Sequence, residues 1–451
     1  MTIIRQPSLF SIQELYDMQP TEKYDAIIDA INLDLIYHEV MKKSRLGAPE
    51  ELNYPAMIIS MFIRYVERIP TIKDLVKRLQ NDIAFKLDCG FLVSDNVPSE
   101  ASYSRLVDKL EASNVLEQAQ EQVIEQALEE GFITDDTVAI DATHFEARDQ
   151  APPKQEKEKP SPKKRGRKTK AERNQWLREQ AEKEANKPLY DKKIEAQLTS
   201  PLADLRKEVP RAPQWGIKKN SEGKNEFWYG YKAHVAVSAS SQYILQSLVS
   251  SGNLNDGKAA IPLLKGMEER LSLPTVRYQT MDAGYDFEPI YQQVYQMNQQ
   301  SIIAYNKRNE PEPLGFDKHF APTCVREHSY RYDSYDAKYE TLKYRHPKEC
   351  SDCPLAQEGL CQKVFKMKIT KDLRRYTAPA RGSVAWKKLF KKRTAVERVN
   401  AYLKEFFQLD NVRYRSGERA KVHCDVTTLI YNASKLAADR IGALLNDQQA
   451  A

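Results

Sequence analysis

Three acidic side chains occupy positions at which carboxylates commonly perform chemistry. Asp141 ends a β-prone run at 137–141, Asp282 follows another such run at 275–281, and Glu397 lies in a helical stretch. A carboxylate at the carboxyl end of a strand sits where α/β folds usually place their reactive groups. Three carboxylates that converge without a protein base repel one another, and divalent cations relieve that repulsion. We therefore predict a metal site built from these three side chains.

Magnesium suits such a site because Mg²⁺ prefers oxygen ligands and keeps positions open for a substrate phosphate. Two ions about 4 Å apart can activate an attacking water or 3′-hydroxyl and stabilise the leaving oxygen. We predict two Mg²⁺ ions, for which Mn²⁺ can substitute. In this interpretation Asp141 bridges both ions, while Asp282 and Glu397 bind one ion each.

The stretch around Glu397, residues 386–407, has a pattern that predicts one long helix. Its apolar side chains recur at helical spacing and form one stripe: Leu389, Val396, Val399, Leu403, Phe406 and Phe407. At about 100° per residue, a second set falls within an arc of about 60° beside that stripe: Phe390, Arg393, Glu397 and Lys404. Ordinary charge pairs on a surface helix would give the same pattern for any one residue. The two aspartates upstream favour a functional site.

The spacing Phe390-x2-Arg393-x3-Glu397-x6-Lys404 resembles the Y-R-E-K signature of bacterial insertion-sequence transposases of the DDE type. Phe390 departs from it, because the family usually has tyrosine there, so an aromatic ring is kept without its hydroxyl. The run from Asp282 through Ala-Gly to Tyr285 resembles the family's second catalytic motif. The resemblance covers most of the chain and includes all three acidic positions.

Membership of that family would imply a transposase that binds the terminal inverted repeats of an insertion sequence, cleaves there and transfers the 3′-ends to target DNA. Double-stranded DNA would be the partner, at both the element ends and the target. The active form would be a homodimer or a larger synaptic complex. Arg393 and Lys404 would hold DNA phosphates, and Phe390 would contribute a ring for packing or stacking. Two alternatives remain, a transposase-derived DNA-binding protein without catalysis and a metal-dependent nuclease of the same fold.

The strand and helix patterns predict a fold once two inserts are set aside. The strand with Asp141 is followed by strands at 226–239 and 243–249, a helix at 257–271 and the strand that delivers Asp282. Another helix, a strand at 301–305 and the Glu397 helix complete the series. This order suits an α/β fold with a mixed sheet flanked by helices and resembles the ribonuclease-H-like fold. An all-α N-terminal domain and a cysteine-rich insertion accompany it.

Four segments follow from these patterns. Residues 1–130 are predicted to form a helical domain that binds DNA ends, and 131–305 to form the first part of the catalytic domain. A disordered basic insert is expected at 148–213. Residues 306–380 are predicted to form the cysteine-containing insertion, and 381–446 to complete the catalytic domain with two helices.

Positive charge gathers locally, although the net charge of the 451-residue chain is only +6. The run from Lys163 to Lys170 is mostly basic, and its core resembles an A·T-hook in which Arg165 and Arg167 would enter a narrow minor groove. Local basic stripes suit a polyanion such as DNA. A generic polyanion-binding or solubilising loop is the alternative interpretation.

Four of the six cysteines fall close together in the sequence: Cys324, Cys350, Cys353 and Cys361. The C-x2-C pair with two outliers fits tetrahedral thiolate zinc, so we predict a structural Zn²⁺ site. Unliganded thiols and an iron–sulfur cluster are the alternatives.

The N-terminal residues lack the basic and apolar regions of a signal peptide, and the most apolar run, 54–66, is too short to span a bilayer. We expect no membrane association and a bacterial cytoplasmic, nucleoid-associated protein.

Overall fold

A computed structural model describes residues 21–41, 52–153, 169–219, 222–311, 313–358 and 361–450. The chain divides into two units. Unit 1 takes residues 1–134, 241–247 and 397–451, and unit 2 takes residues 135–240 and 248–396. Residues 397–451 thus group with the N-terminal helices, whereas the sequence analysis placed 381–446 with the catalytic sheet.

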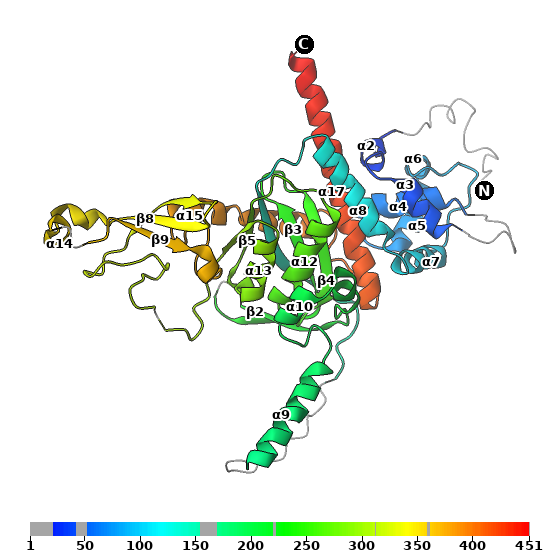
Figure 1. The fold of residues 1–451 in the computed structure, drawn as a ribbon. Helices are drawn as coiled ribbons and strands as arrows, with labels where there is room; N and C mark the ends of the chain where they lie inside the picture. The colour runs from blue at the N-terminus through cyan, green and yellow to red at the C-terminus, as the bar shows by residue number, and fades with distance from the viewer. Residues whose placement is uncertain are drawn as a thin grey trace, which may run out of the picture. The chain divides into compact units, whose positions relative to one another are not determined.

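Unit 1 is built from helices (Figure 1). Its N-terminal helices are α2 (Asp25–Ile28), α3 (Leu33–Val40), α4 (Tyr54–Val66), α5 (Ile72–Asn81), α6 (Ile83–Asp88), α7 (Glu100–Glu111) and α8 (Val115–Glu129). The long C-terminal helix α17 (Gly417–Ala450) packs against α8 and α7. None of the helices in the described ranges is long and apolar enough to cross a membrane.

Local sequence explains where these helices begin. The side chain of Asn53 accepts a hydrogen bond from the Ala56 backbone N–H, and Pro55 occupies the first turn of α4. Polar contacts then attach α17 to the bundle. The Tyr65 hydroxyl lies 2.9 Å from His423 Nδ1, and Thr428 donates to Gln120 at 2.7 Å. Because all four side chains are buried or nearly so, these contacts fix the register of α17.

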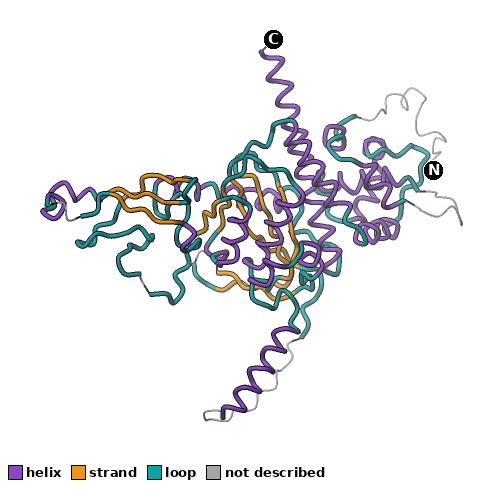
Figure 2. The backbone as a smooth tube through the Cα atoms, viewed as in Figure 1, coloured by secondary structure: helices purple, strands orange, loops and turns teal. Residues whose placement is uncertain are grey.

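Unit 2 is organised around a six-stranded mixed sheet, drawn in orange in Figure 2. Its strands are β1 (Thr137–Glu146), β2 (Gln214–Lys219), β3 (Asn225–Ser238), β4 (Ile244–Ser251), β5 (Tyr278–Met281) and β6 (Gln300–Ile303). Their order is β2-β3-β1-β5-β6, with β4 also paired to β3. Strand β1 runs antiparallel to β3 and parallel to β5, and β5 runs parallel to β6. The predicted α/β fold, of the ribonuclease-H-like kind, is confirmed.

The parallel pairing of β1 with β5 sets the level of the two aspartates. Ala139 pairs with Thr280, so Asp141 and Asp282, each two residues further on, lie at the same level just past the parallel pairing. Side-chain direction repeats every two residues along a strand, so this register keeps the two positions side by side. Helices α12 (Gly257–Arg270) and α13 (Glu288–Gln296) pack on each other and on this sheet (Figure 1).

Gly230 allows β3 to lie close to the far end of β1. A Cβ built on Gly230 would come within 2.4 Å of the Phe145 carbonyl oxygen and 2.7 Å of the Ala147 nitrogen. We expect Gly230→Ala to lower the free energy of unfolding by about 1–3 kcal/mol, because backbone atoms of the pairing must move. Gly442→Ala is the control, since nothing lies within 4 Å of that position. Urea unfolding should show that Gly442→Ala is slightly more stable than the wild type. A Gly230→Ala variant as stable as Gly442→Ala would contradict the close approach of the two strands.

A disordered basic insert was expected at 148–213, and the described residues of this stretch, 148–153 and 169–213, correct that expectation. Three helices occupy part of the stretch: α9 (Lys170–Ala185), α10 (Glu195–Thr199) and α11 (Leu202–Lys207). Helix α9 is exposed along its length, but Tyr190, Leu202 and Leu205 are buried. These apolar side chains supply the burial that a disordered segment lacks. Strand β2, which the sequence analysis did not predict, follows directly.

The cysteine-containing insertion carries a sheet of its own, in the order β7-β8-β9. Its strands are β7 (Arg331–Asp336), β8 (Thr341–Arg345) and β9 (Val364–Lys368), all antiparallel. One face packs on a small apolar cluster that contains Leu342, Tyr344 and Ile369. The sequence analysis predicted no strands here because the outward positions are polar and the strands are short.

Candidate active site

Asp141 lies inside β1 and not at its end, which corrects the sequence analysis. The strand continues to Glu146 because the antiparallel partner β3 pairs with it throughout. The parallel partner β5 pairs only with residues 137–139, so Asp141 stands just past the end of that pairing. Asp282 directly follows β5, and its Oδ1 accepts a hydrogen bond of 2.8 Å from the Gly284 backbone N–H. The prediction that Asp282 follows a strand is confirmed.

Burial and mutual repulsion dominate the electrostatics of this pair. The pKa of Asp141 is raised to about 7, chiefly by burial and also by the nearby carboxylates of Asp282 and Asp256, against the opposing effects of the Ala142 backbone N–H and Arg393. Burial also raises the pKa of Asp282, with Asp256 contributing in the same direction. Two neighbouring carboxyl groups that resist ionisation form a donor set that a divalent cation would stabilise. The residues therefore fit a cation with oxygen ligands.

The raised pKa of Asp141 predicts a stability cost at neutral pH. Because the pKa of Asp141 is about 7 in the folded state and 3.8 for an ordinary aspartate, the charge destabilises the fold increasingly as the pH rises from about 4 to 7. We expect Asp141→Asn to be more stable than the wild type at pH 8 in EDTA, by about 1–2 kcal/mol. The difference should vanish near pH 4. Urea unfolding at both pH values tests this, and an equal or lower stability at pH 8 would contradict it.

Arg393 is the cation nearest to Asp141 among the predicted site residues. Its Nη1 lies 3.8 Å from Asp141 Oδ2, and both side chains are about four-fifths buried. Arg393 lies at this position because the predicted helix is interrupted: residues 386–407 belong to two helices and not one. Helix α15 (Val384–Lys391) ends before Arg393, and α16 (Thr394–Glu405) begins after it. The single long helix was therefore a wrong prediction.

The interruption is a tight turn at Lys392 and Arg393. The Arg393 N–H bonds to the Phe390 carbonyl at 3.1 Å and the Val396 N–H bonds to the Arg393 carbonyl at 3.2 Å, both with a spacing of three residues. Lys392 is held by Asp136, whose Oδ1 lies 2.6 Å from its Nζ. An ion pair to the strand entry thus competes with regular helix geometry. The hydrophobic pattern did not reveal it, because Lys392 and Arg393 continue the helical charge pattern.

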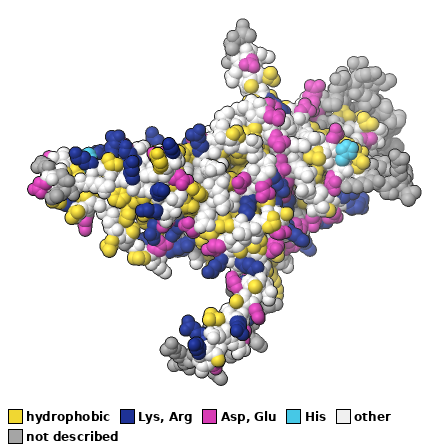
Figure 3. All heavy atoms as spheres, viewed as in Figure 1, with side chains coloured by type: hydrophobic (Ala, Val, Ile, Leu, Met, Phe, Trp, Pro, Cys, Tyr) yellow, Lys and Arg dark blue, Asp and Glu magenta, His cyan; other side chains and the backbone are white. Residues whose placement is uncertain are grey.

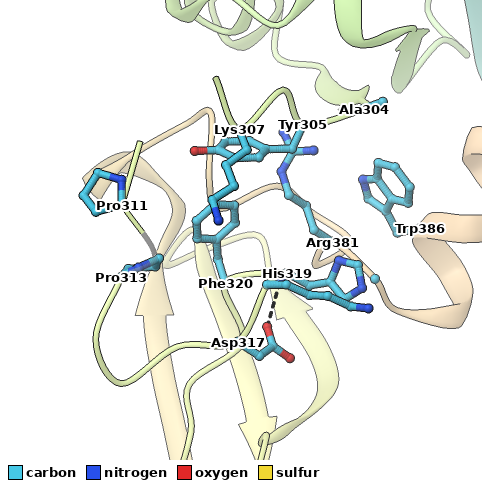
Figure 4. A pocket seen from close by; sticks show the side chains of 12 residues that line it. Ala304, Tyr305, Lys307, Pro311, Pro313, Asp317, His319, Phe320, Arg381 and Trp386 are labelled. Carbon is cyan, nitrogen blue, oxygen red and sulfur yellow. Dashed lines mark hydrogen bonds between the residues drawn. The ribbon is translucent and has the colours of Figure 1, made fainter. Parts of the chain in front are cut away.

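Phe390 stacks on Trp386, with ring centres 4.9 Å apart and planes inclined by 12°. Trp386 also lines a pocket of about 320 Å³ with Tyr305, Phe320 and Arg381 (Figure 4). Figure 4 shows the aromatic rings and the Arg381 guanidinium around one hollow, with Asp317 bonded to the backbone N–H of His319. Phe390 thus packs next to this pocket, within the same unit as the two aspartates, and its predicted role at DNA stays a prediction.

Glu397 and Lys404 belong to unit 1. Glu397 is exposed in the first turn of α16, and the side chains that follow on its apolar face, Val399 and Leu403, are fully buried. The Nζ of Lys404 lies 3.1 Å from Asp410 Oδ1. The role of Glu397 as a metal ligand and of Lys404 as a phosphate contact remain predictions.

Sequence reasoning missed two residues beside the aspartates, Asp256 and Tyr285. Asp256 directly precedes α12, but its side chain makes no capping hydrogen bond and instead accepts one from Lys232 at 2.7 Å. The Tyr285 ring is buried at the end of the turn that follows Asp282. The only available signal was their place in two motif-like runs, Asn-Leu-Asn-Asp and Asp-Ala-Gly-Tyr.

The four clustered cysteines are free thiols. Besides burial, the neighbouring Cys324, Cys353 and Cys361 raise the pKa of the Cys350 thiol, so the four lie within electrostatic range of one another. Arg326 Nη1 donates to Cys353 Sγ at 3.7 Å and lowers the pKa of that thiol. Among the described residues, however, no three His, Cys, Asp or Glu side chains are grouped so that they could hold a metal ion. Zinc in this insertion remains a prediction.

The insertion sheet has one strongly basic face. The strand register places Lys343 opposite Lys366 and Arg331 opposite Arg345, with Lys368 next on the same face of β9. Asp333 pairs with Lys343 and Arg345, so part of this charge is balanced. Figure 3 shows Lys and Arg side chains gathered over this part of the molecule. The predicted minor-groove residues Arg165 and Arg167 lie outside the described ranges.

Two protein-family models match the chain. One, described as a transposase DDE domain, matches residues 206–433, which is just over half of the chain and includes Asp282 and Glu397. The other, described as a transposase domain (DUF772), matches residues 13–109 in the helical N-terminal region. Asp141 precedes the first match. No curated protein matches the chain.

Proposed function

This chain belongs to the DDE transposases, and from that membership we propose that it cleaves DNA at the terminal inverted repeats of an insertion sequence and joins the 3′-ends to target DNA. The observation that carries the proposal is the pairing of Asp141 with Asp282. They stand at one level of a parallel strand pair, half-buried, with raised pKa values. A pure DNA-binding protein has no need of such a destabilising acidic pair.

We propose Asp141, Asp282 and Glu397 as the ligands of two divalent cations, most simply Mg²⁺. Bound there, the cations would supply Lewis-acid activation of a water or 3′-hydroxyl and charge neutralisation at the phosphate. Asp141 and Asp282 must be ionised to act, and the Arg393 guanidinium 3.8 Å from Asp141 favours the ionised form. The assignment of Glu397 rests on the family signature and on its spacing after Arg393, which directly precedes α16 and lies next to Asp141.

DNA would be held by the positively charged side chains of two groups of residues. Arg393 and Lys404 fit phosphate contacts in the signature. The basic face with Lys343, Lys366 and Lys368 fits the spaced phosphates of a duplex, and such contacts are independent of sequence. Joining two ends to one target would require at least two copies of the chain, so a dimer or larger synaptic complex is part of the proposal.

The test is incubation of the protein with a duplex that carries the flanking inverted repeat, in Mg²⁺, with strand cleavage and strand joining followed on a gel. We expect specific cleavage at the repeat and joining of the new 3′-ends. Specific binding without cleavage in Mg²⁺ or Mn²⁺ would favour a DNA-binding relic. Cleavage without joining of pre-cleaved ends would favour a nuclease of the same fold.

A further inference from the structure

A second set of polar groups lies beside Asp141 and Asp282, contributed by Lys232, Asp256 and Tyr285. Lys232 Nζ donates to Asp256 Oδ1 at 2.7 Å and to the Leu254 carbonyl at 2.9 Å. These bonds fix the Asp256 carboxylate. Its second oxygen, Oδ2, accepts no hydrogen bond from any residue in the described ranges. One carboxylate oxygen is therefore held by a lysine and the other is available to a ligand.

Packing brings Asp256 close to the segment that follows Asp282. Helix α12 begins at the next residue, Gly257, and packs against the turn Ala283–Tyr285. A Cβ on Gly257 would come within 2.6 Å of the Phe287 ring, so only glycine allows this approach. In agreement, the charge of Asp256 contributes to raising the pKa of both Asp141 and Asp282.

The hydroxyl of Tyr285 independently indicates that a ligand or water binds here. Its side chain is fully buried, and within the described part of the chain its hydroxyl has no hydrogen-bond partner. The hydroxyl lies within electrostatic range of all three carboxylates, Asp141, Asp256 and Asp282, which together with burial keep it protonated by raising its pKa. A buried hydroxyl without a partner costs about 1–3 kcal/mol, so such groups usually bond to a water or a ligand.

We propose that Asp256 and Tyr285 are positioning residues that bind water molecules in the hydration shell of the cation held by Asp141 and Asp282. The proposal rests on the proposed function, because it presumes that cation. Indirect binding is the form that the geometry favours, since Asp141, Asp256 and Asp282, all within the described ranges, are not grouped closely enough to hold an ion together. Mg²⁺ commonly keeps several waters and uses only one or two carboxylates directly. Asp256 would accept from such a water, and Tyr285 would donate to an oxygen of the same shell.

The test measures Mn²⁺ binding to the full chain without DNA. The electron paramagnetic resonance signal of the free ion reports how much Mn²⁺ remains unbound. We expect Asp256→Asn to weaken Mn²⁺ binding by between about tenfold and a hundredfold, as loss of outer ligands typically does. Tyr285→Phe removes only the hydroxyl and should weaken binding by about threefold or more. Glu269→Gln, an exposed carboxylate at the other end of α12, is the matched control and should bind Mn²⁺ as the wild type does.

Two further variants separate the explanations. Lys232→Met with Asp256→Asn removes both charges, so a persistent loss assigns the effect to the carboxylate and not to an unpaired lysine. Asp141→Asn reports on the proposed cation site itself. If Asp141→Asn weakens binding but Asp256→Asn matches Glu269→Gln, the inference is overturned and the proposed function stands. If neither weakens binding, both fail. A loss that only parallels a lower unfolding temperature in EDTA would make Asp256 structural and also overturn the inference.

Discussion

Asp141→Asn is expected to lower the rate of end cleavage by at least about a thousandfold while leaving binding of the end duplex unchanged. The substitution keeps the shape of the side chain but removes the charge that the proposed cation needs. Loss of several kcal/mol of transition-state stabilisation costs a factor of ten for each ~1.4 kcal/mol. The same substitution should stabilise the metal-free fold at pH 8, because the pKa of Asp141 is raised to about 7. Lower activity with higher stability is the signature of a functional and not a structural carboxylate.

Glu146→Gln is the matched control, because Glu146 is the exposed last residue of the same strand. It should cleave at close to the wild-type rate. Single-turnover cleavage with saturating Mg²⁺ separates the chemical step from binding, which a gel-shift assay measures in parallel. Cleavage by Asp141→Asn within about tenfold of the wild type would remove Asp141 from the reacting centre. Parallel losses of cleavage and binding would instead assign it to DNA recognition.

Arg374→Met is expected to cause the largest loss of stability, about 3–5 kcal/mol in the free energy of unfolding. Arg374 donates to the fully buried Asp286 at 2.8 Å from Nη2 and 3.0 Å from Nε. It also pairs with Glu310 and donates to the Asn306 carbonyl at 2.8 Å. Removing one partner of a buried ion pair leaves the other charge uncompensated, which is the costly case. Tyr291 and the Asn306 N–H still bond to Asp286, so the loss stays below a complete collapse.

The neighbouring Arg375 provides the comparison. Arg375 is about one-third exposed and pairs with Glu310 at 3.1 Å, so Arg375→Met should cost no more than about 1 kcal/mol. Asp286→Asn combined with Arg374→Met should recover part of the loss, because no buried charge is then left alone. Urea unfolding at pH 7 measures all three. Equal losses for Arg374→Met and Arg375→Met would show that the buried pair adds nothing beyond a surface contact.

The ion pairs of Glu310 also predict an acid dependence. Hydrogen bonds from Tyr305 and Arg374 lower the pKa of Glu310 to about 2 from the ordinary glutamate value of 4.5. A lowered pKa stabilises the fold above the unfolded value, and that contribution is lost as the pH falls from about 4.5 to 2. The stability gap between the wild type and Arg374→Met should therefore narrow over this range. An unchanged gap at pH 3 would assign the loss to packing.

Sequence pattern predicted the fold where apolar periodicity was continuous. The runs before Asp141 and Asp282 are rich in β-branched residues, and both form strands that pair in parallel. The end of β1 was predicted too early because residues 142–146 include three polar side chains and pair with β3 on one edge only. The hydrophobic pattern of a sequence indicates which residues are buried, but it does not indicate which strands pair with one another.

The details of the site depended on tertiary contacts that no local pattern encodes. At the turn, Lys392 forms an ion pair with Asp136, more than 250 residues earlier in the chain, and the charge pattern of 386–407 continues through the turn. Asp256 has the sequence context of an N-cap, but Lys232 on a neighbouring strand takes its carboxylate. The insertion strands have basic outer faces, so their alternation is hidden among charged residues.

The central claim is that three carboxylates act together on DNA through divalent cations, and Glu397→Gln tests it most directly. The measurement is Mg²⁺-dependent cleavage of a duplex with the flanking inverted repeat, by the wild type and by Glu397→Gln, with end binding measured in the same samples. The account predicts cleavage by the wild type, its loss in the variant and equal binding by both. Equal cleavage by the two proteins would remove Glu397 from the site and contradict the three-carboxylate account.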